Sequence, residues 1–150
     1  MTAKVELSLT GSLDQLRIVW QTGEALLESI PFVEDAEGTR YNFLVSVQEM
    51  VTNVLRHAYQ GDEDRPIEVT FEFDETGFSA ELRDQGPEFD PLNYDTDDLA
   101  TGDSIPEQVG GYGIMIVRTI MDSVHYQRRD GWNCLRMKKL VDSSVCVPNG

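Results

Sequence analysis

TRYNFLVSVQEMVTNVLRHAY, residues 39–59, is the stretch that decides the fold of this chain. Its apolar residues recur with the 3.6-residue period of a helix that buries one broad face. They are Phe43, Leu44, Val47, Met50, Val51, Val54, Leu55 and Ala58. Its polar residues Asn42, Ser46, Glu49, Asn53 and His57 are spaced by four, three, four and four positions, which is typical of one narrow stripe. We predict a long amphipathic helix with Glu49 and Asn53 one turn apart.

Strands are predicted on both sides of this helix. KVELSLT (4–10) precedes it, and IEVTFEF (67–73) and FSAELRD (78–84) follow it, each alternating apolar with polar residues. The turn at 74–77 favours pairing the latter two strands as a hairpin. VHYQR (124–128) and WNCLRMKKL (132–140), joined by an Asp-Gly turn at 130–131, predict two more strands.

Two further helices complete the predicted set of elements. One runs from a capping pattern of Ser12 and Gln15 to Pro31, with Gly23 weakening its middle. The other follows GGYG (110–113) and ends near Asp122. The order of elements predicts an α+β fold, a two-layer sandwich with helices on one face of a mixed, mostly antiparallel sheet.

A chain of 150 residues is the size of a single domain, and we expect one domain over residues 1–150. Residues 85–109 contain several Gly and Pro residues and many acids, which predicts a long functional loop. The tail at 142–150 is predicted to be disordered.

The charge and cysteine content exclude several classes of function. The formal net charge of −15 would repel nucleic acid and anionic membranes, so we expect neither as a partner. No stretch approaches the ~20 apolar residues of a membrane span or has the form of a secretory leader, which predicts a cytoplasmic protein. The two cysteines, Cys134 and Cys146, lack metal-ligand spacing, which argues against a structural zinc site.

Three short patterns could bind a ligand. Glu49 and Asn53 share a helix face, Asp84 ends a strand two residues before Gly86, and GGYG precedes a helix whose N-terminus favours an anion such as phosphate. Each pattern alone also has an ordinary structural interpretation, namely a solvated helix face, a strand-ending turn and a glycine-rich loop. GGYG matches neither the P-loop nor the dinucleotide fingerprint.

Taken together and in this order, the three patterns resemble the N, G1 and G2 boxes of the GHKL ATPases. The likeness is strongest to the anti-sigma-factor serine kinases, in QEMVTNVLRHAY (48–59), LRDQGPEFDP (82–91) and GGYGIMIVRTIMDSVHY (110–126). It extends over about residues 5–140, because WNCLRMKKL (132–140) is similar to the closing strand of that family.

The resemblance implies a role for each site residue. Glu49 would act as the general base, and Asn53 would bind Mg²⁺ held by the ATP phosphates. Asp84 would accept a hydrogen bond from the adenine amino group, with Gly86 making room for the base. The phosphates would be cradled by Gly110, Gly111, Tyr112 and Gly113. Residues 92–109 would form the ATP lid, and His57 is interpreted as structural.

The resemblance implies an ATP-dependent anti-sigma-factor serine kinase of bacteria that phosphorylates an anti-sigma antagonist, regulates a sigma factor and forms a homodimer. The chain departs from the family in two ways. Glu88 occupies a position where the wider superfamily has glycine, and no Lys or Arg occurs from Asp84 to Val117. The alternative is therefore a catalytically weak or inactive nucleotide-binding module that switches between protein partners. A domain that binds no nucleotide is the third hypothesis.

Overall fold

The structure, a computed structural model, describes residues 2–90 and 111–142. Five strands form one sheet in the order β1-β2-β3-β5-β4. The strands are β1 (Ala3–Thr10), β2 (Pro66–Phe73), β3 (Gly77–Asp84), β4 (Ser123–Arg129) and β5 (Trp132–Leu140). The helical elements are η1 (Leu13–Gln15), α1 (Leu16–Leu27), α2 (Ala36–Asn53), η2 (Val54–Ala58) and α4 (Gly111–Ile120).

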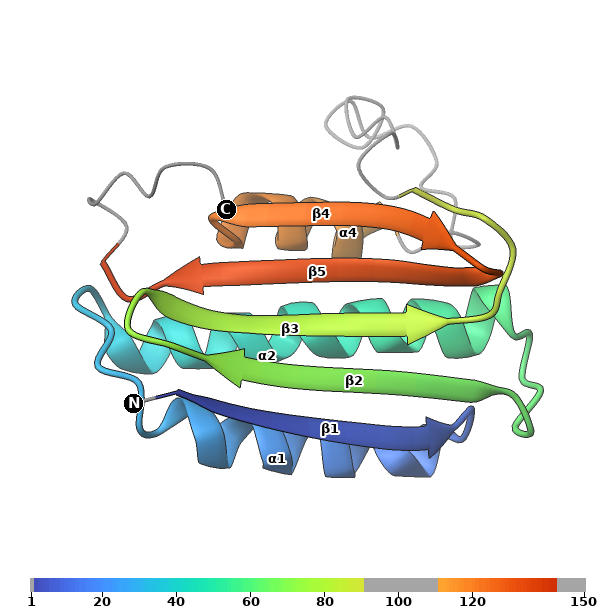
Figure 1. The fold of residues 1–150 in the computed structure, drawn as a ribbon, viewed down its shortest axis with the longest axis horizontal. Helices are drawn as coiled ribbons and strands as arrows, with labels where there is room; N and C mark the ends of the chain where they lie inside the picture. Colours follow the sequence, from blue (N-terminus) through green and yellow to red (C-terminus); the bar gives the residue numbers. More distant parts are fainter. Residues whose placement is uncertain (1, 91–110, 143–150) are drawn as a thin grey trace.

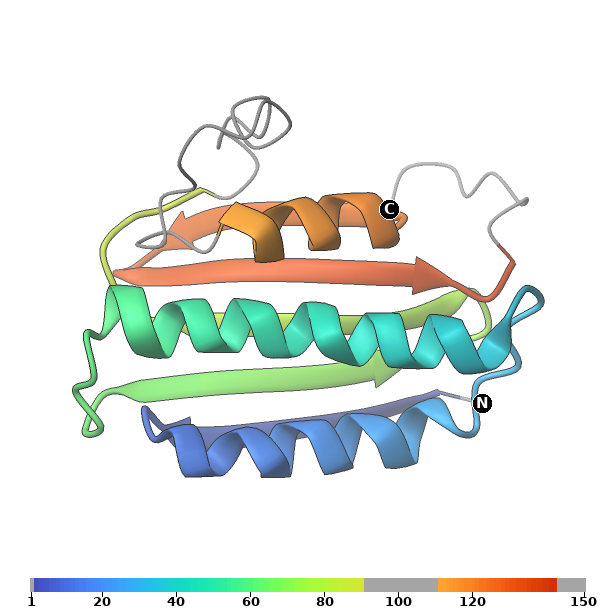
Figure 2. The ribbon, with the colours of Figure 1, turned by 180° about the vertical axis from the view of Figure 1, so that it is seen from behind.

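The alternation of residues along the strands sets the two faces of the sheet. In β2, every second residue from Ile67 to Phe73 is buried, while the polar residues between them stay partly exposed. Figure 1 shows the sheet in front of the helices, and Figure 2 shows from behind that the helices cover one face only. The predicted α+β, two-layer architecture is therefore confirmed.

An aromatic cluster joins the helix layer to the sheet. Phe43 of α2 packs edge-on against Phe78 of β3, with ring centroids 5.0 Å apart, and Phe78 stacks on Phe71 of β2 at 5.7 Å. All three side chains are fully buried. The broad apolar face predicted for residues 39–59 thus lies over the middle of the sheet. This packing holds α2 close to the sheet.

The pairing of the strands is simpler than the predicted mixed sheet. All neighbouring pairs of the described strands are antiparallel. β3 and β4 run in the same direction, but β5 lies between them, so they do not pair with each other. The hairpin predicted around 74–77 is confirmed, with Phe73 opposite Phe78.

The long helix differs from the prediction at both ends. It begins at Ala36, because the side chain of Asp35 accepts a hydrogen bond from the Gly38 amide and caps the first turn. It ends as an α-helix at Asn53 and continues as the π-helical turn η2, where the Tyr59 amide donates to the Val54 carbonyl at 2.8 Å. Periodicity alone could not predict this change of hydrogen-bond pattern.

Parts of three predictions lie outside the described residues. They are residues 91–109 of the predicted loop, which include the whole predicted lid at 92–109, Gly110 of the glycine-rich pattern, and residues 143–150 of the predicted tail. Among the helices that the structure does describe, none has both the length and the apolar character required to span a membrane.

Candidate functional site

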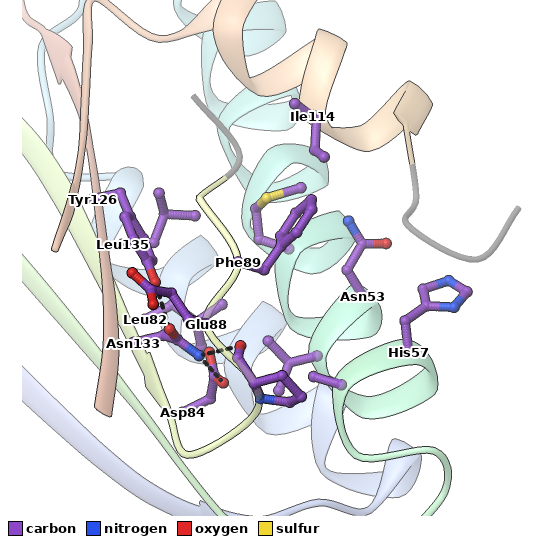
Figure 3. Close-up of a pocket in the computed structure, with 14 residues that line it drawn as sticks. Asn53, His57, Leu82, Asp84, Glu88, Phe89, Ile114, Tyr126, Asn133 and Leu135 are labelled. Carbon is purple, nitrogen blue, oxygen red and sulfur yellow. Dashed lines mark hydrogen bonds between the residues drawn. The ribbon is translucent and has the colours of Figure 1, made fainter. Parts of the chain in front are cut away.

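A cavity of about 240 Å³ opens between the end of the long helix and the sheet. Figure 3 shows Asn53 and His57 on the helix side, and Asp84, Asn133, Tyr126 and Leu135 on the sheet side. Most of its lining is apolar, with a few polar groups at its edge, as in small-molecule sites. The lining residues are Met50, Asn53, Val54, His57, Ala58, Leu82, Asp84, Pro87, Glu88, Phe89, Ile114, Tyr126, Asn133 and Leu135.

Asp84 supplies a buried carboxylate to this cavity. Only 6% of the residue is exposed, and its Oδ1 accepts hydrogen bonds from the Gly86 amide at 2.8 Å and from Nδ2 of Asn133 at 3.0 Å. Burial raises the pKa of Asp84, whereas these two bonds and the charges of Arg128 and Arg65 lower it. Both hydrogen bonds that described residues donate to this side chain end on Oδ1, and none of those residues donates to Oδ2.

Asn133 connects Asp84 to the last two strands. Its Nδ2 also donates to the carbonyls of Gly86 at 3.1 Å and Pro87 at 3.0 Å. Its Oδ1 accepts from the Tyr126 hydroxyl at 2.6 Å and from Nη1 of Arg128 at 3.0 Å. The amide therefore ties the turn after β3 to β4 and β5.

The turn at residues 85–87 is also held from the other side. The Gln85 amide donates to the Tyr59 hydroxyl at 2.8 Å, and the Gln85 carbonyl accepts from the Arg65 guanidinium, which lies 4.5 Å from the centre of the Tyr59 ring. A Cβ on Gly86 would lie 2.7 Å from Cβ of Ala58. Glycine at position 86 is therefore required by contact with η2, in addition to any ligand.

Glu49 and Asn53 lie one turn apart on α2, as predicted, and both are half-buried. Asn53 lines the cavity, while Glu49 lies against the first turn of α4: a Cβ on Gly113 would be 3.0 Å from Cβ of Glu49 and 3.1 Å from its Oε2. The helix N-box and the glycine-rich pattern are thus brought together, and glycine at 113 permits the close approach of α4 to α2.

One expectation for this region needs correction, and one alternative interpretation is limited. The helix after GGYG begins at Gly111, so Gly111, Tyr112 and Gly113 form its first turn rather than a preceding loop. The alternative interpretation of the polar stripe, a solvated helix face, does not hold along its whole length, because Ser46 is fully buried and donates to the Asn42 carbonyl at 2.9 Å. In addition, His57, which we interpreted as structural, lines the cavity.

The sequence-based set of site residues lacks Asn133, Tyr126 and Arg128. A signal for Asn133 was present in the strand pattern, because Asn133, Leu135 and Met137 occupy successive inward positions of β5. A polar residue at an inward strand position is uncommon and points to a buried hydrogen-bond network. Its partners could not be deduced without the pairing of Asp84 with Asn133 across β3 and β5.

The chain matches the family model described as the histidine kinase-like ATPase domain over residues 9–139. It is 30% identical to the serine/threonine-protein kinase BtrW of Bordetella bronchiseptica, in an alignment covering 91% of this chain and 92% of that protein. It is 27% identical to the serine-protein kinase RsbW of Listeria innocua, over 67% of this chain and 66% of the relative. A chain of the SiaB-SiaC complex of Pseudomonas aeruginosa has the same fold, with a TM-score of 0.62 at 13% identity, over 90% of this chain and 88% of that one.

Proposed function

The chain belongs to the histidine kinase-like ATPase family, and from this membership we propose that it is an ATP-dependent serine kinase acting on an anti-sigma antagonist. The observation that carries the proposal is the cavity, in which Asp84 offers a buried acceptor opposite the helix that bears Asn53. The relatives named serine kinases support the reaction type. From the sequence resemblance, we also propose that the protein binds a sigma factor and forms a homodimer in the cytoplasm.

The base of ATP would occupy the apolar part of the cavity. Oδ2 of Asp84 would accept a hydrogen bond from the 6-amino group of adenine, while Leu82, Leu135 and Ile114 would contact its ring. Gly86 leaves the turn close to η2 and keeps a side chain out of this end of the site.

The phosphates would lie toward Asn53 and the first turn of α4. This turn, with Gly110 before it, would donate backbone amides to them at the positive end of the helix dipole. Asn53 would bind Mg²⁺ together with phosphate oxygens, an arrangement that Mg²⁺ commonly adopts. Among the described residues, no group of three or more His, Cys, Asp or Glu side chains is placed to hold a metal ion by itself. Bound Mg²⁺ would neutralise charge on the phosphates during transfer.

Glu49 would act on the hydroxyl of the substrate serine. The serine oxygen forms a bond to the γ-phosphorus, the bond from that phosphorus to the β–γ bridging oxygen breaks, and ADP leaves. The hydroxyl proton passes to the carboxylate of Glu49. Its position against Gly113 supports this role, because it is next to the proposed phosphate-binding turn.

One observation favours the second candidate function, a nucleotide-binding partner switch with little or no kinase activity. The described residues that line the cavity include no Lys or Arg. Arg128 and Arg65 lie near Asp84, at the proposed base end, and are committed to the carbonyls of the 85–87 turn. Charge stabilisation of the transferred group would then depend on Mg²⁺, backbone amides or a partner residue.

Nucleotide binding is tested by calorimetry with MgATP and MgADP. We expect micromolar affinity, about −8 kcal/mol, for the wild type. Asp84→Asn should lose most of this affinity, because its amide NH₂ would face the adenine amino group, and both groups are donors. Asp14→Asn, a change at an exposed residue of η1, is the matched control and should bind like the wild type. A folded wild type that binds neither nucleotide would contradict the proposal.

Kinase activity is tested by transfer of labelled γ-phosphate to a purified anti-sigma antagonist and to its serine-to-alanine variant. Glu49→Gln should reduce the transfer rate by about 10²–10⁴-fold, the usual contribution of a general base. Glu72→Gln, on the helix-free face of β2, is the control and should not change the rate. Binding of ATP without transfer would favour the partner switch over the kinase.

A further inference from the structure

The hydrogen bonds of Asn133 allow only one orientation of its amide. Arg128 can donate but cannot accept, so the atom of Asn133 that faces it must be the oxygen. The nitrogen then faces three acceptors: Oδ1 of Asp84 and the carbonyls of Gly86 and Pro87. The orientation of this side chain is therefore fixed by chemistry as well as by packing.

This orientation determines what the cavity presents to a ligand. Nδ2 of Asn133 and the Gly86 amide together occupy Oδ1 of Asp84, and the carbonyls of Gly86 and Pro87 point to Asn133. Both hydrogen bonds that the described residues donate to the Asp84 side chain end on Oδ1, and Asp84 lines the cavity. Oδ2 is thus the acceptor that this end of the cavity offers.

Building on the proposed function, we propose that Asn133, oriented by Tyr126 and Arg128, is a positioning residue that makes Asp84 selective for a 6-amino purine over a 6-oxo purine. With Oδ1 occupied, an ionised Asp84 can only accept at Oδ2. It pairs with the amino group of adenine and repels the 6-oxo group of hypoxanthine, which is itself an acceptor. Figure 3 shows Asn133 beside Asp84, with dashed lines for the hydrogen bonds between the residues drawn.

The charge of Asp84 depends on the same network. Burial favours its neutral form, and the donors favour the ionised form. Among the described residues, the other charged or titratable groups near it are Arg65, Arg128 and Tyr59, with His57, Glu88 and Tyr126 also on the cavity lining. Without the Asn133 donor, Asp84 should take up a proton at a higher pH. A protonated carboxyl can donate to a 6-oxo group, so selectivity should fall.

The test measures dissociation constants of MgATP and of the inosine analogue MgITP by calorimetry at pH 5.5 and pH 7.5. We expect the wild type to bind ATP at least about tenfold more tightly than ITP, which corresponds to the free energy of one good hydrogen bond. In Asn133→Ala this preference should be about tenfold smaller. Between pH 7.5 and pH 5.5, the ATP affinity of the variant should fall by a larger factor than that of the wild type. His57 and Glu88 are unchanged in the variant, so comparison at equal pH cancels their contributions.

Milder variants keep the test decisive if Asn133→Ala does not fold. Tyr126→Phe removes only a hydroxyl, and Arg128→Gln removes the charge and the Nη1 donor; each should reduce the ATP preference by about two- to fivefold. Arg129→Gln, the adjacent residue on the opposite face of β4, is the matched control and should leave the preference unchanged.

The outcomes separate this inference from the proposed function. An unchanged ratio of ATP to ITP affinity in folded variants, with ATP still bound, would overturn the role of Asn133 and leave the proposed function intact. A folded wild type that binds neither nucleotide would overturn both. A general loss of affinity for ATP and ITP alike would show a merely structural role and would also overturn the inference.

Discussion

Asp84 lies at the end of β3 among groups that act on its charge in opposite directions. Burial raises its pKa, while Asn133, the Gly86 amide, Arg128 and Arg65 lower it, and the net direction is upward. A carboxyl with a raised pKa stabilises the fold fully below its unfolded pKa, about 3.9, and that contribution is lost as the pH rises through the folded value. At neutral pH, the ionised Asp84 therefore reduces the stability of the fold.

The residue-scale prediction is that Asp84→Asn stabilises the protein at pH 7 by on the order of 1 kcal/mol, because stability and function compete at such sites. The amide oxygen of asparagine can still accept from Gly86 and Asn133, and no charge is buried. The difference from the wild type should shrink toward zero as the pH falls below about 4. Urea unfolding at pH 7 and pH 4 measures it. A variant less stable than the wild type at pH 7 would contradict this account.

At the same scale, the sequence could predict residues but not their partners. Asp84, Gly86, Glu49 and Asn53 stand out because ordered motifs carry them. The role of Asn133 depends on its pairing with Asp84, which lies on the neighbouring strand β3 and 49 positions earlier in the sequence. Only the register of β3 against β5 brings the two side chains together, and register is a property of the whole sheet.

At the scale of elements, the hydrophobic pattern predicted where helices and strands occur, but not how tightly they pack. Gly23 illustrates the difference. In an isolated helix, glycine costs about 1 kcal/mol relative to alanine. In the structure, Gly23 is buried where α1 packs against α2 and β2, and an added Cβ would lie 2.7 Å from Cδ2 of Leu44 and 3.1 Å from Cζ of Phe71.

The prediction at this scale is that Gly23→Ala destabilises the protein by about 1–3 kcal/mol, because overpacking outweighs the gain in helix propensity. Urea unfolding monitored by circular dichroism measures the free energy of unfolding. Gln21→Ala, at an exposed position of the same helix, is the control and should change it by no more than about 0.5 kcal/mol. Stabilisation by Gly23→Ala would contradict this account, because it would mean that α1 can move away from β2 without loss of packing energy.

The turn η2 could not be predicted for a related reason. The apolar period of residues 39–59 continues through it, so the pattern fits an uninterrupted α-helix. The π-helical bond from Tyr59 to Val54 instead accompanies a tertiary requirement: the Tyr59 hydroxyl donates to the Pro66 carbonyl and accepts from the Gln85 amide. Inserted π-turns of this kind are frequent at functional sites, and this one places Ala58 against Gly86.

At the scale of the whole molecule, the sequence predicted the architecture because the order of elements leaves few ways to cover one sheet face. The net charge of −15 also belongs to this scale. It is unevenly distributed, since six of the 12 basic residues lie between positions 118 and 139, in α4, β4 and β5. They are Arg118, Arg128, Arg129, Arg136, Lys138 and Lys139. A nucleotide approaching the proposed site would meet the summed field of these basic residues and of the acidic residues.

The last prediction concerns that field. If the net charge dominates, ATP is repelled at long range, and salt should relieve the repulsion because it screens charges beyond about 8–10 Å. The association rate constant of MgATP, measured by stopped-flow fluorescence, should therefore rise as NaCl increases from about 0.01 to 0.15 M. Adenosine has the same base without the phosphates, so its rate should not change. A rate for MgATP that falls with salt would mean that the cations of α4, β4 and β5 dominate the approach to the site.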